Sequence, residues 1–569
     1  MFTRKQLITV LLLVVLAAAF RIAIVHYLPN DTTDDSLGYE QIARNVLERH
    51  VYTNYAEPPY TPTLVRLPGY PLFLAAIYSV FGHTNNTAVR IVQALLDTGT
   101  CVLVAMLAWL WQPDERRKTR TAIAALALAA INPFTTIYAA LILTEVPATF
   151  LTVAACITTT LAFRAEKLEQ ELRWWAISGA LISVGVLFRP DLGLVAASAG
   201  ITLVAVRFFG AKAQNAPERR RRSFRPAHSI FGRILLPGAV FTVGFVLVLA
   251  PWTIRNWRTL HVFQPLAPRN AGLPGEFTPL GYEHWLKTWM TDGDYLDDLL
   301  WDLDKNQIDV EELPDSAFDS QAEHDRVSDL FDQYNGPEDE NAAGNQKVKP
   351  ASSPTPPSSP PSSPPSSSPG ASANQTQPAQ KPGDETNEDT DEADAENEAN
   401  KEQPEKVGTM TPEIDAAFGQ IANERIARHP FRYYVLLPLR RAHSLWFNTH
   451  SDFYPFTGNA LPLNNPDNSP SQHFWLPFFA VLVAICTILG VGGFVLLAMN
   501  EGSDGRTWVL LIVLIFATRL ALFSMAVSVE ARYVVEFFPF LFAAGGIAIV
   551  EFMGRLRRQY PERWRRDRP

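Results

Sequence analysis

Apolar runs long enough to cross a membrane recur along most of this 569-residue chain. A bilayer core is about 30 Å thick, and a helix of about 20 residues crosses it. Soluble cores do not need repeated runs of this length, so we expect an all-α, polytopic membrane protein with about ten transmembrane helices. The expected spans are 6–28, 87–111, 121–139, 146–163, 174–188, 192–208, 234–252, 474–499, 508–527 and 534–553.

The first run is interpreted as a retained span. It contains Arg21, extends to Leu28 and lacks the small-residue cleavage site of a signal peptide. Residues 69–82 are also apolar, but this segment is too short to cross and follows Pro68. We expect it to lie along the interface, with amphipathic helices in the first outer loop, residues 29–86.

Basic residues give the orientation, since Lys and Arg collect in cytoplasmic loops. Four segments are rich in them: 115–120, 164–173, 207–233 and 555–568. Threading ten spans through these segments places the first outer loop and the long hydrophilic region between residues 257 and 473 on the non-cytoplasmic face.

The composition of this hydrophilic region divides it. Residues 351–380 are rich in Ser and Pro, and residues 384–405 are acidic and almost free of aromatic side chains. We expect a disordered linker here, and function should survive trimming it. The expected organisation is a transmembrane module at 1–256, an extracytoplasmic segment at 257–334, the linker at 335–410, a second extracytoplasmic segment at 411–473, and the last spans with a basic tail at 474–569.

Charge and metal-ligand patterns exclude other classes. The net charge is −9, and the basic clusters lie at span ends, so we expect no nucleic-acid partner. The cysteines Cys101, Cys156 and Cys486 lie inside expected spans, where they pack as small apolar residues. Asp292 and Asp294 have metal-site spacing, but further acidic residues follow them and favour a solvated helix face. No metal site is predicted.

Ionisable side chains at membrane depth cost several kcal/mol unless they line a cavity or reach the interface. Here they collect at the outer ends of the spans and in the loops between them. Taken singly, each has a structural explanation: a helix cap, a snorkelling side chain or a local ion pair. Together they suit a site in which arginines bind phosphate and a carboxylate accepts a proton. The residues are Asp34, Asp35, Tyr39, Arg66, Glu145, Arg189, Asp191, Arg255, Glu530 and Arg532.

The order of these motifs resembles that of polytopic GT-C glycosyltransferases. The closest resemblance is to bacterial relatives of dolichyl-phosphate-mannose protein mannosyltransferases and to lipopolysaccharide-core sugar transferases, over residues 1–256 and 429–550. The motifs that carry it are Asp34-Asp35 before Tyr39, Arg66-Leu67-Pro68-Gly69-Tyr70-Pro71, Leu143-Thr144-Glu145, Arg189-Pro190, Trp252-Thr253-Ile254-Arg255-Asn256-Trp257 and Glu530-Ala531-Arg532-Tyr533.

This resemblance implies an inverting transferase of the cell envelope, in the plasma (inner) membrane with its active site on the non-cytoplasmic face. The donor would be a polyprenyl-phosphate sugar, and the acceptor a lipid, glycan or protein. Asp35 would be the general base, with Asp34 assisting. The family more commonly has an Asp-Glu or Glu-Asp pair here. The donor phosphate would be held by Arg189, Arg255 and Arg532, and the substrates oriented by Tyr39, Arg66, Glu145, Glu530 and Tyr533.

No cofactor follows from the resemblance, although a divalent cation is compatible with it. Two other classes remain open from the sequence. A transporter or flippase of a lipid-linked glycan would also carry ionisable groups near its spans, but transporters place them near the midplane and often contain internal repeats. A non-catalytic membrane scaffold that displays the linker is the third class.

Overall fold

The computed structural model describes residues 3–28, 34–82, 84–209, 230–268, 277–336, 408–454, 470–500 and 504–559, with a few isolated residues between 456 and 463. Nine of the helices described in these ranges are long and apolar enough to cross a membrane, and a bent pair raises the number to ten. The spans are α1 (Arg4–Tyr27), α4 (Asn86–Trp111), α7 (Glu145–Arg164), α8 (Leu168–Phe188), α9 (Gly193–Phe209), α10 (Ile230–Leu260), α16 (Pro470–Met499), α17 (Gly505–Ser524) and α18 (Phe538–Gln559), together with the bent pair. The chain is thus a multi-pass membrane protein, as predicted.

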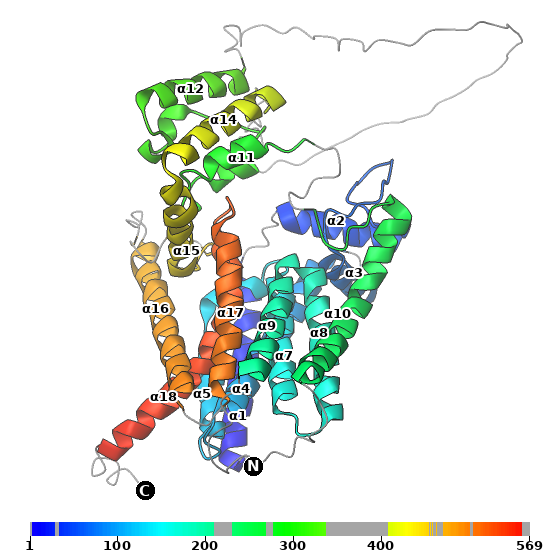
Figure 1. The fold of residues 1–569 in the computed structure, drawn as a ribbon, viewed down its shortest axis with the longest axis vertical. Helices are drawn as coiled ribbons and strands as arrows, with labels where there is room; N and C mark the ends of the chain where they lie inside the picture. Colours follow the sequence, from blue (N-terminus) through cyan, green and yellow to red (C-terminus); the bar gives the residue numbers. More distant parts are fainter. Residues whose placement is uncertain are drawn as a thin grey trace, which may run out of the picture.

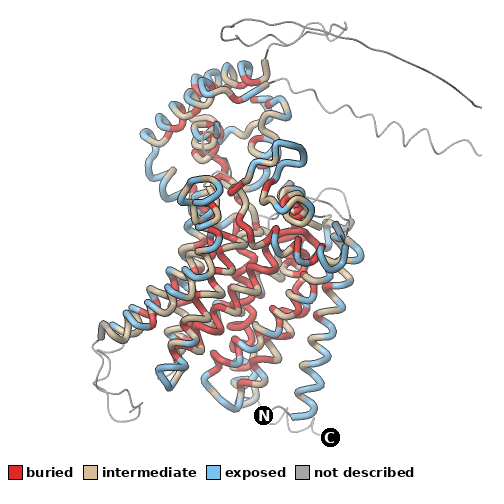
Figure 2. Tube along the Cα trace, turned by 90° about the vertical axis from the view of Figure 1, so that its right-hand side faces the viewer, coloured by how far each residue is buried: buried red, intermediate tan, exposed pale blue. Residues whose placement is uncertain are grey.

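The spans form one bundle, and the two termini lie at the same end of it (Figure 1). Buried residues concentrate in the centre, whereas the outward faces of peripheral helices are exposed (Figure 2). On α10 the exposed side chains include Leu235, Val243 and Leu247, which need an apolar surrounding. Small residues let helices approach closely: a Cβ on Gly179 of α8 would lie 2.1 Å from the carbonyl oxygen of Phe241 in α10.

One expected span is broken. The sequence predicts a continuous helix over 121–139, but α5 (Lys118–Ala130) ends early and is followed, after a bend of 65°, by α6 (Pro133–Thr136) and η1 (Ile137–Ala139). The cause is local. Pro133 has no N–H to continue the helix, and the side chain of Asn132 accepts a hydrogen bond from Thr135 N at 3.1 Å, which starts a new one.

Two short helices cover the end of the bundle opposite the termini. In Figure 1, α2 (Asp34–Arg49) lies across this end with α3 (Gly69–Phe81) beside it. Ile42 and Ala43 of α2 are fully buried, which confirms its amphipathic character, and α3 has 13 residues, too few to span.

Beyond this end lies a small helical unit, which we call the outer unit: residues 277–336 and 408–428. It contains α11 (Leu280–Leu286), α12 (Gln321–Asn335) and α14 (Pro412–Arg428), packed around an aromatic core that includes Tyr282, Trp285 and Phe418. The two parts of the chain hydrogen-bond to each other, since Asp415 accepts from Tyr282 N at 2.8 Å and Gly408 packs directly against Tyr334.

The outer unit connects to the bundle through η6 (Arg432–Leu436) and α15 (Leu437–Phe447). Arg441 of α15 is buried and donates a hydrogen bond to the Met290 carbonyl oxygen at 2.8 Å. Most of the predicted linker, residues 337–407, lies outside the described residues.

Candidate active site

A buried charge network lies at the end of the bundle opposite the termini. Arg189 follows α8, which Pro190 ends, and its guanidinium bridges two carboxylates: Glu145 Oε1 at 2.7 Å and Asp191 Oδ1 at 3.2 Å. Glu145 is the first residue of α7 and Asp191 lies in η2 (Pro190–Leu192). Two chain reversals between spans therefore bring these groups together.

Two further residues complete this network, and the sequence analysis assigned neither of them to the site. Arg519 of α17 contacts Asp191 Oδ2 at 2.5 Å and Glu536 Oε2 at 2.8 Å, and Glu536 Oε1 lies 3.5 Å from Arg189 Nε. Both side chains are completely buried. A charged residue inside the apolar run 508–527 is the signal that identifies Arg519. We call this set the inner cluster: Glu145, Arg189, Asp191, Arg519 and Glu536.

A second, more accessible network lies beside it. Asp35, near the start of α2, contacts Arg66 at 2.7 Å and Arg532 at 3.1 Å, and Arg532 also contacts Glu530 at 2.6 Å. Burial raises the pKa of Asp35, but Arg66 and Arg532 outweigh burial and hold the pKa below its ordinary value. With Tyr533, these residues form the outer cluster: Asp35, Arg66, Glu530, Arg532 and Tyr533.

Tyrosine rings connect the parts of the site. The guanidinium carbons of Arg189 and Arg532 lie 5.7 and 5.6 Å from the ring centre of Tyr533, so one ring lies between the two clusters. The Tyr39 ring lies 5.3 Å from the Arg66 guanidinium and packs edge-on against Tyr70. These rings provide apolar walls around charged groups.

Most residues expected at the site are therefore brought together there, and Arg255 is the exception. It donates hydrogen bonds to the carbonyl oxygens of Thr63 at 2.7 Å and Tyr52 at 3.2 Å, and its described contacts include neither cluster. The Tyr52 hydroxyl in turn donates to the Arg66 carbonyl oxygen at 3.0 Å. Arg255 thus holds the loop that carries Arg66. For Asp34, the side chain lies outside the described part of the molecule.

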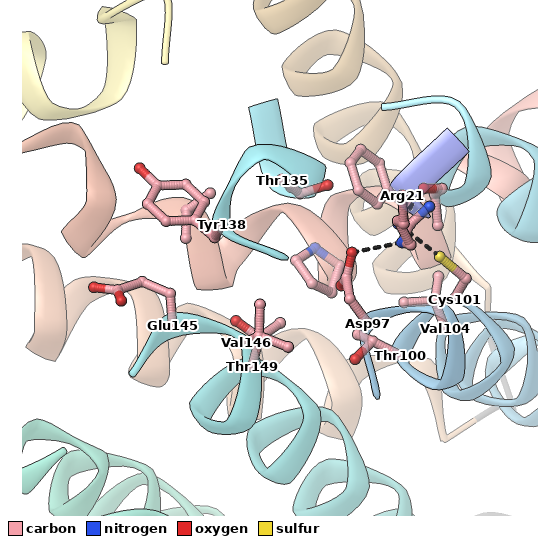
Figure 3. A pocket seen from close by; sticks show the side chains of 14 residues that line it. Arg21, Asp97, Thr100, Cys101, Val104, Thr135, Tyr138, Glu145, Val146 and Thr149 are labelled. Carbon is pink, nitrogen blue, oxygen red and sulfur yellow. Dashed lines mark hydrogen bonds and ion pairs between the residues drawn. The ribbon is translucent and has the colours of Figure 1, made fainter. Parts of the chain in front are cut away.

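Glu145 has spare hydrogen-bonding capacity. Its side chain is buried, and its Oε2 has no hydrogen-bond partner among the described residues. Glu145 lies at one end of a cavity of about 20 Å³, with Tyr138 and Thr149 between it and the Arg21–Asp97 pair (Figure 3). This volume accommodates about one water molecule.

One more carboxylate, Asp452, lies near Glu530 and Arg532 in the chain between α15 and α16, and the sequence analysis did not identify it. Asp452 is exposed to solvent, yet neighbouring protein groups also desolvate its carboxylate. Desolvation by this protein and the negative charge of Glu530 raise the pKa of Asp452 to about 6.

The chemistry of the site follows from this donor set. In the two clusters four arginines face five carboxylates. Guanidinium groups bind phosphate in a bidentate manner without losing their charge, and carboxylates accept protons or sugar hydroxyl groups. Within the described ranges, no group of three or more His, Cys, Asp or Glu side chains is arranged to hold a metal ion.

One part of the chain matches the sequence model of a known protein family. The family model described as dolichyl-phosphate-mannose-protein mannosyltransferase matches residues 62–213. No curated protein matches the sequence. This matched segment contains Arg66, Glu145 and Arg189.

Solved structures of low sequence identity are similar. The oligosaccharyltransferase of Archaeoglobus fulgidus, tethered to an acceptor peptide, is 12% identical with a TM-score of 0.47, over 97% of this chain and 50% of its own. ArnT from Cupriavidus metallidurans, bound to undecaprenyl phosphate, is 13% identical with a TM-score of 0.31, over 94% of this chain and 78% of its own. The chain thus spans about half the length of the oligosaccharyltransferase. Over residues 62–213, it carries the sequence pattern of the dolichyl-phosphate-mannose-protein mannosyltransferase family, which confirms the resemblance described above.

Proposed function

We propose that this protein is a membrane glycosyltransferase that transfers a hexosyl or pentosyl group from a polyprenyl-phosphate donor to a lipid, glycan or protein acceptor, with inversion at the anomeric carbon. The observation that carries this proposal is the meeting of four arginines and five carboxylates at one end of the bundle, partly within the segment that matches the mannosyltransferase family.

We also propose the membrane in which the protein lies and the side that its active site faces. The basic segments that the structure describes in full, 115–120 and 164–173, lie at the end of the bundle that holds the termini (Figure 1), and Arg117 pairs there with Glu551 of α18. The positive-inside rule makes that end cytoplasmic, so the active site faces the other side of the plasma (inner) membrane.

The solvent exposure of each arginine side chain indicates which arginines can contact the donor. The side chains of Arg66 and Arg532 are 35% and 14% exposed, whereas Arg519 is completely buried between its two carboxylates. Arg66 and Arg532 therefore bind the donor phosphate, and Arg189 supports them through the Tyr533 ring. Arg255 contributes indirectly, by fixing the loop that carries Arg66.

Asp35 is the proposed general base. The acceptor hydroxyl oxygen forms a bond to the anomeric carbon, the bond from that carbon to the phosphate oxygen breaks, and the hydroxyl proton passes to Asp35. Polyprenyl phosphate leaves with its negative charge stabilised by the arginines.

Through its ion pairs with Arg66 and Arg532, the pKa of Asp35 depends on whether the donor is bound. Without donor, Arg66 and Arg532 depress the pKa of Asp35 and so weaken it as a base. A donor phosphate competes for the same two guanidinium groups. When they turn to the phosphate, the pKa of Asp35 rises, so the base becomes effective only in the donor complex. Meanwhile Glu145 Oε2 and Tyr39 orient sugar hydroxyl groups.

The test is release of free polyprenyl phosphate from a panel of polyprenyl-phosphate sugars, with acceptor extracts, by wild type, Asp35→Asn and the control Asp298→Asn in nanodiscs. Asp298 is an exposed carboxylate of the outer unit. We expect release by wild type and the control, and a loss of at least about a hundredfold in Asp35→Asn. Equal rates in all three would remove Asp35 as the base. No release by wild type would favour a transporter or scaffold instead.

A further inference from the structure

A buried arginine inside the membrane lies outside both clusters. Arg21 of α1 is six residues before the end of that helix, about 9 Å along its axis, and its side chain is 1% exposed. Its Nε contacts Asp97 Oδ2 of α4 at 2.6 Å, and its Nη2 lies 3.0 Å from Cys101 Sγ. Figure 3 shows these groups at the far end of the cavity from Glu145.

Arg21 Nη1 also donates to the Ala17 carbonyl oxygen of its own helix, and two further hydrogen bonds of Arg21 reach the end of α5. Its two terminal nitrogens donate to the carbonyl oxygens of Ala129 and Ala130, each at 3.2 Å. These are the last two residues of α5, where the span breaks. The Ala129 carbonyl would normally accept from residue 133, but Pro133 has no N–H. Arg21 therefore supplies donors to carbonyl groups that the break leaves open in an apolar environment.

Helix α4 holds the segment after the break from the same side. Gln93 lies one helical turn before Asp97 and donates to the Leu141 carbonyl oxygen at 2.6 Å, while its own Oε1 accepts from the Tyr70 hydroxyl at 2.8 Å. One face of α4 thus fixes both ends of the segment 131–141, directly through Gln93 and through Arg21 held by Asp97.

Glu145 lies four residues beyond this anchored segment. We propose that Arg21, held by Asp97, is a positioning residue for the active site: by capping the broken end of α5 it fixes the chain that places Glu145 against Arg189. This inference rests on the proposed function for its catalytic consequence, whereas its structural part can be measured without activity.

Three variants test it: Arg21→Gln, Arg21→Lys and Asp97→Asn. The matched control is Arg207→Gln, because Arg207 of α9 pairs with Glu171 of α8 at 2.6 Å near the opposite end of the bundle. Turnover and donor KM are measured per molecule of folded protein in nanodiscs, and amide hydrogen exchange is followed over residues 131–145.

In Arg21→Gln we expect turnover to fall at least about tenfold, because even a small displacement of a group in the active site lowers the reaction rate. The donor KM should stay within about threefold of wild type. Lysine restores the charge beside Asp97 but not both carbonyl contacts, so Arg21→Lys recovers part of the turnover. Amide hydrogen exchange over 131–145 should be faster than in wild type for Arg21→Gln and the same as in wild type for Arg207→Gln. If Arg21→Gln does not fold, Asp97→Asn takes its place, and we expect it to show lower turnover and faster exchange over 131–145 than the control Arg207→Gln.

Turnover and exchange in the Arg21 and Asp97 variants equal to those of Arg207→Gln would overturn the inference while leaving the transferase proposal intact. An inactive wild type would instead end the transferase proposal, and the exchange comparison would still decide whether Arg21 fixes this segment.

Discussion

Replacing Arg519 by methionine is the sharpest test of the inner cluster. The substitution keeps an unbranched chain of similar length but removes the cation between Asp191 and Glu536, contacts of 2.5 and 2.8 Å. Arg189 is then the remaining described cation of the cluster, facing three carboxylates. Removing one partner of a buried ion pair costs about 3–5 kcal/mol, because the other charge stays desolvated.

The free energy of unfolding is measured in mixed micelles by tryptophan fluorescence. We expect Arg519→Met to lose about 3–5 kcal/mol and the double variant Arg519→Met/Glu536→Gln to recover at least about 1 kcal/mol of it, since residues in contact couple by about that amount. The control is Arg326→Met, which breaks an exposed 2.8 Å pair with Glu424 and should cost at most about 1 kcal/mol. A loss no larger than that of the control, or no recovery in the double variant, would refute the charge balance argued for this cluster.

Three other predictions concern the outer cluster and its surroundings. Donor binding should tighten as the pH falls through about 6, since protonating Asp452 removes a negative charge near the phosphate site; in Asp452→Asn, titrations between pH 5 and 8 should lose the change centred near pH 6. Arg532→Gln should weaken donor binding at least about tenfold through loss of a charged hydrogen bond, whereas Arg255→Gln should stay within about threefold of wild type in equilibrium binding; a larger effect for Arg255 would return it to the phosphate site. The pKa of Asp35, followed by carboxyl carbon NMR, lies below its ordinary value in the free protein and should rise when polyprenyl phosphate is added; an unchanged pKa would contradict the exchange of arginines between carboxylate and phosphate.

The apolar runs predicted nearly every span because length and hydropathy are local properties of the sequence. The break at Pro133 was missed, since the run 121–139 remains apolar across it. The local signal was present in Asn132-Pro133, a capping residue followed by a residue without an N–H.

The site was only partly predictable. Glu145, Arg189 and Arg532 stand at span ends, where a charge attracts attention, whereas Arg519 lies inside a span and its importance depends on the direction in which it points. Its partner Asp191 is 328 residues away in the sequence, and no local pattern predicts such a pairing. The contacts of Arg255 could not be predicted for the same reason: its position at a span end was evident, but the loop it holds was not.

The junction in the outer unit has a practical consequence. Because Gly408 lies directly against Tyr334, the chain leaves and re-enters the folded unit at almost the same point. The length of the excursion between them then has only a weak, logarithmic effect on folding free energy. A fluorescent protein or an affinity handle fused at this junction should report on the extramembrane side of the molecule without disturbing the helices that line the reaction centre.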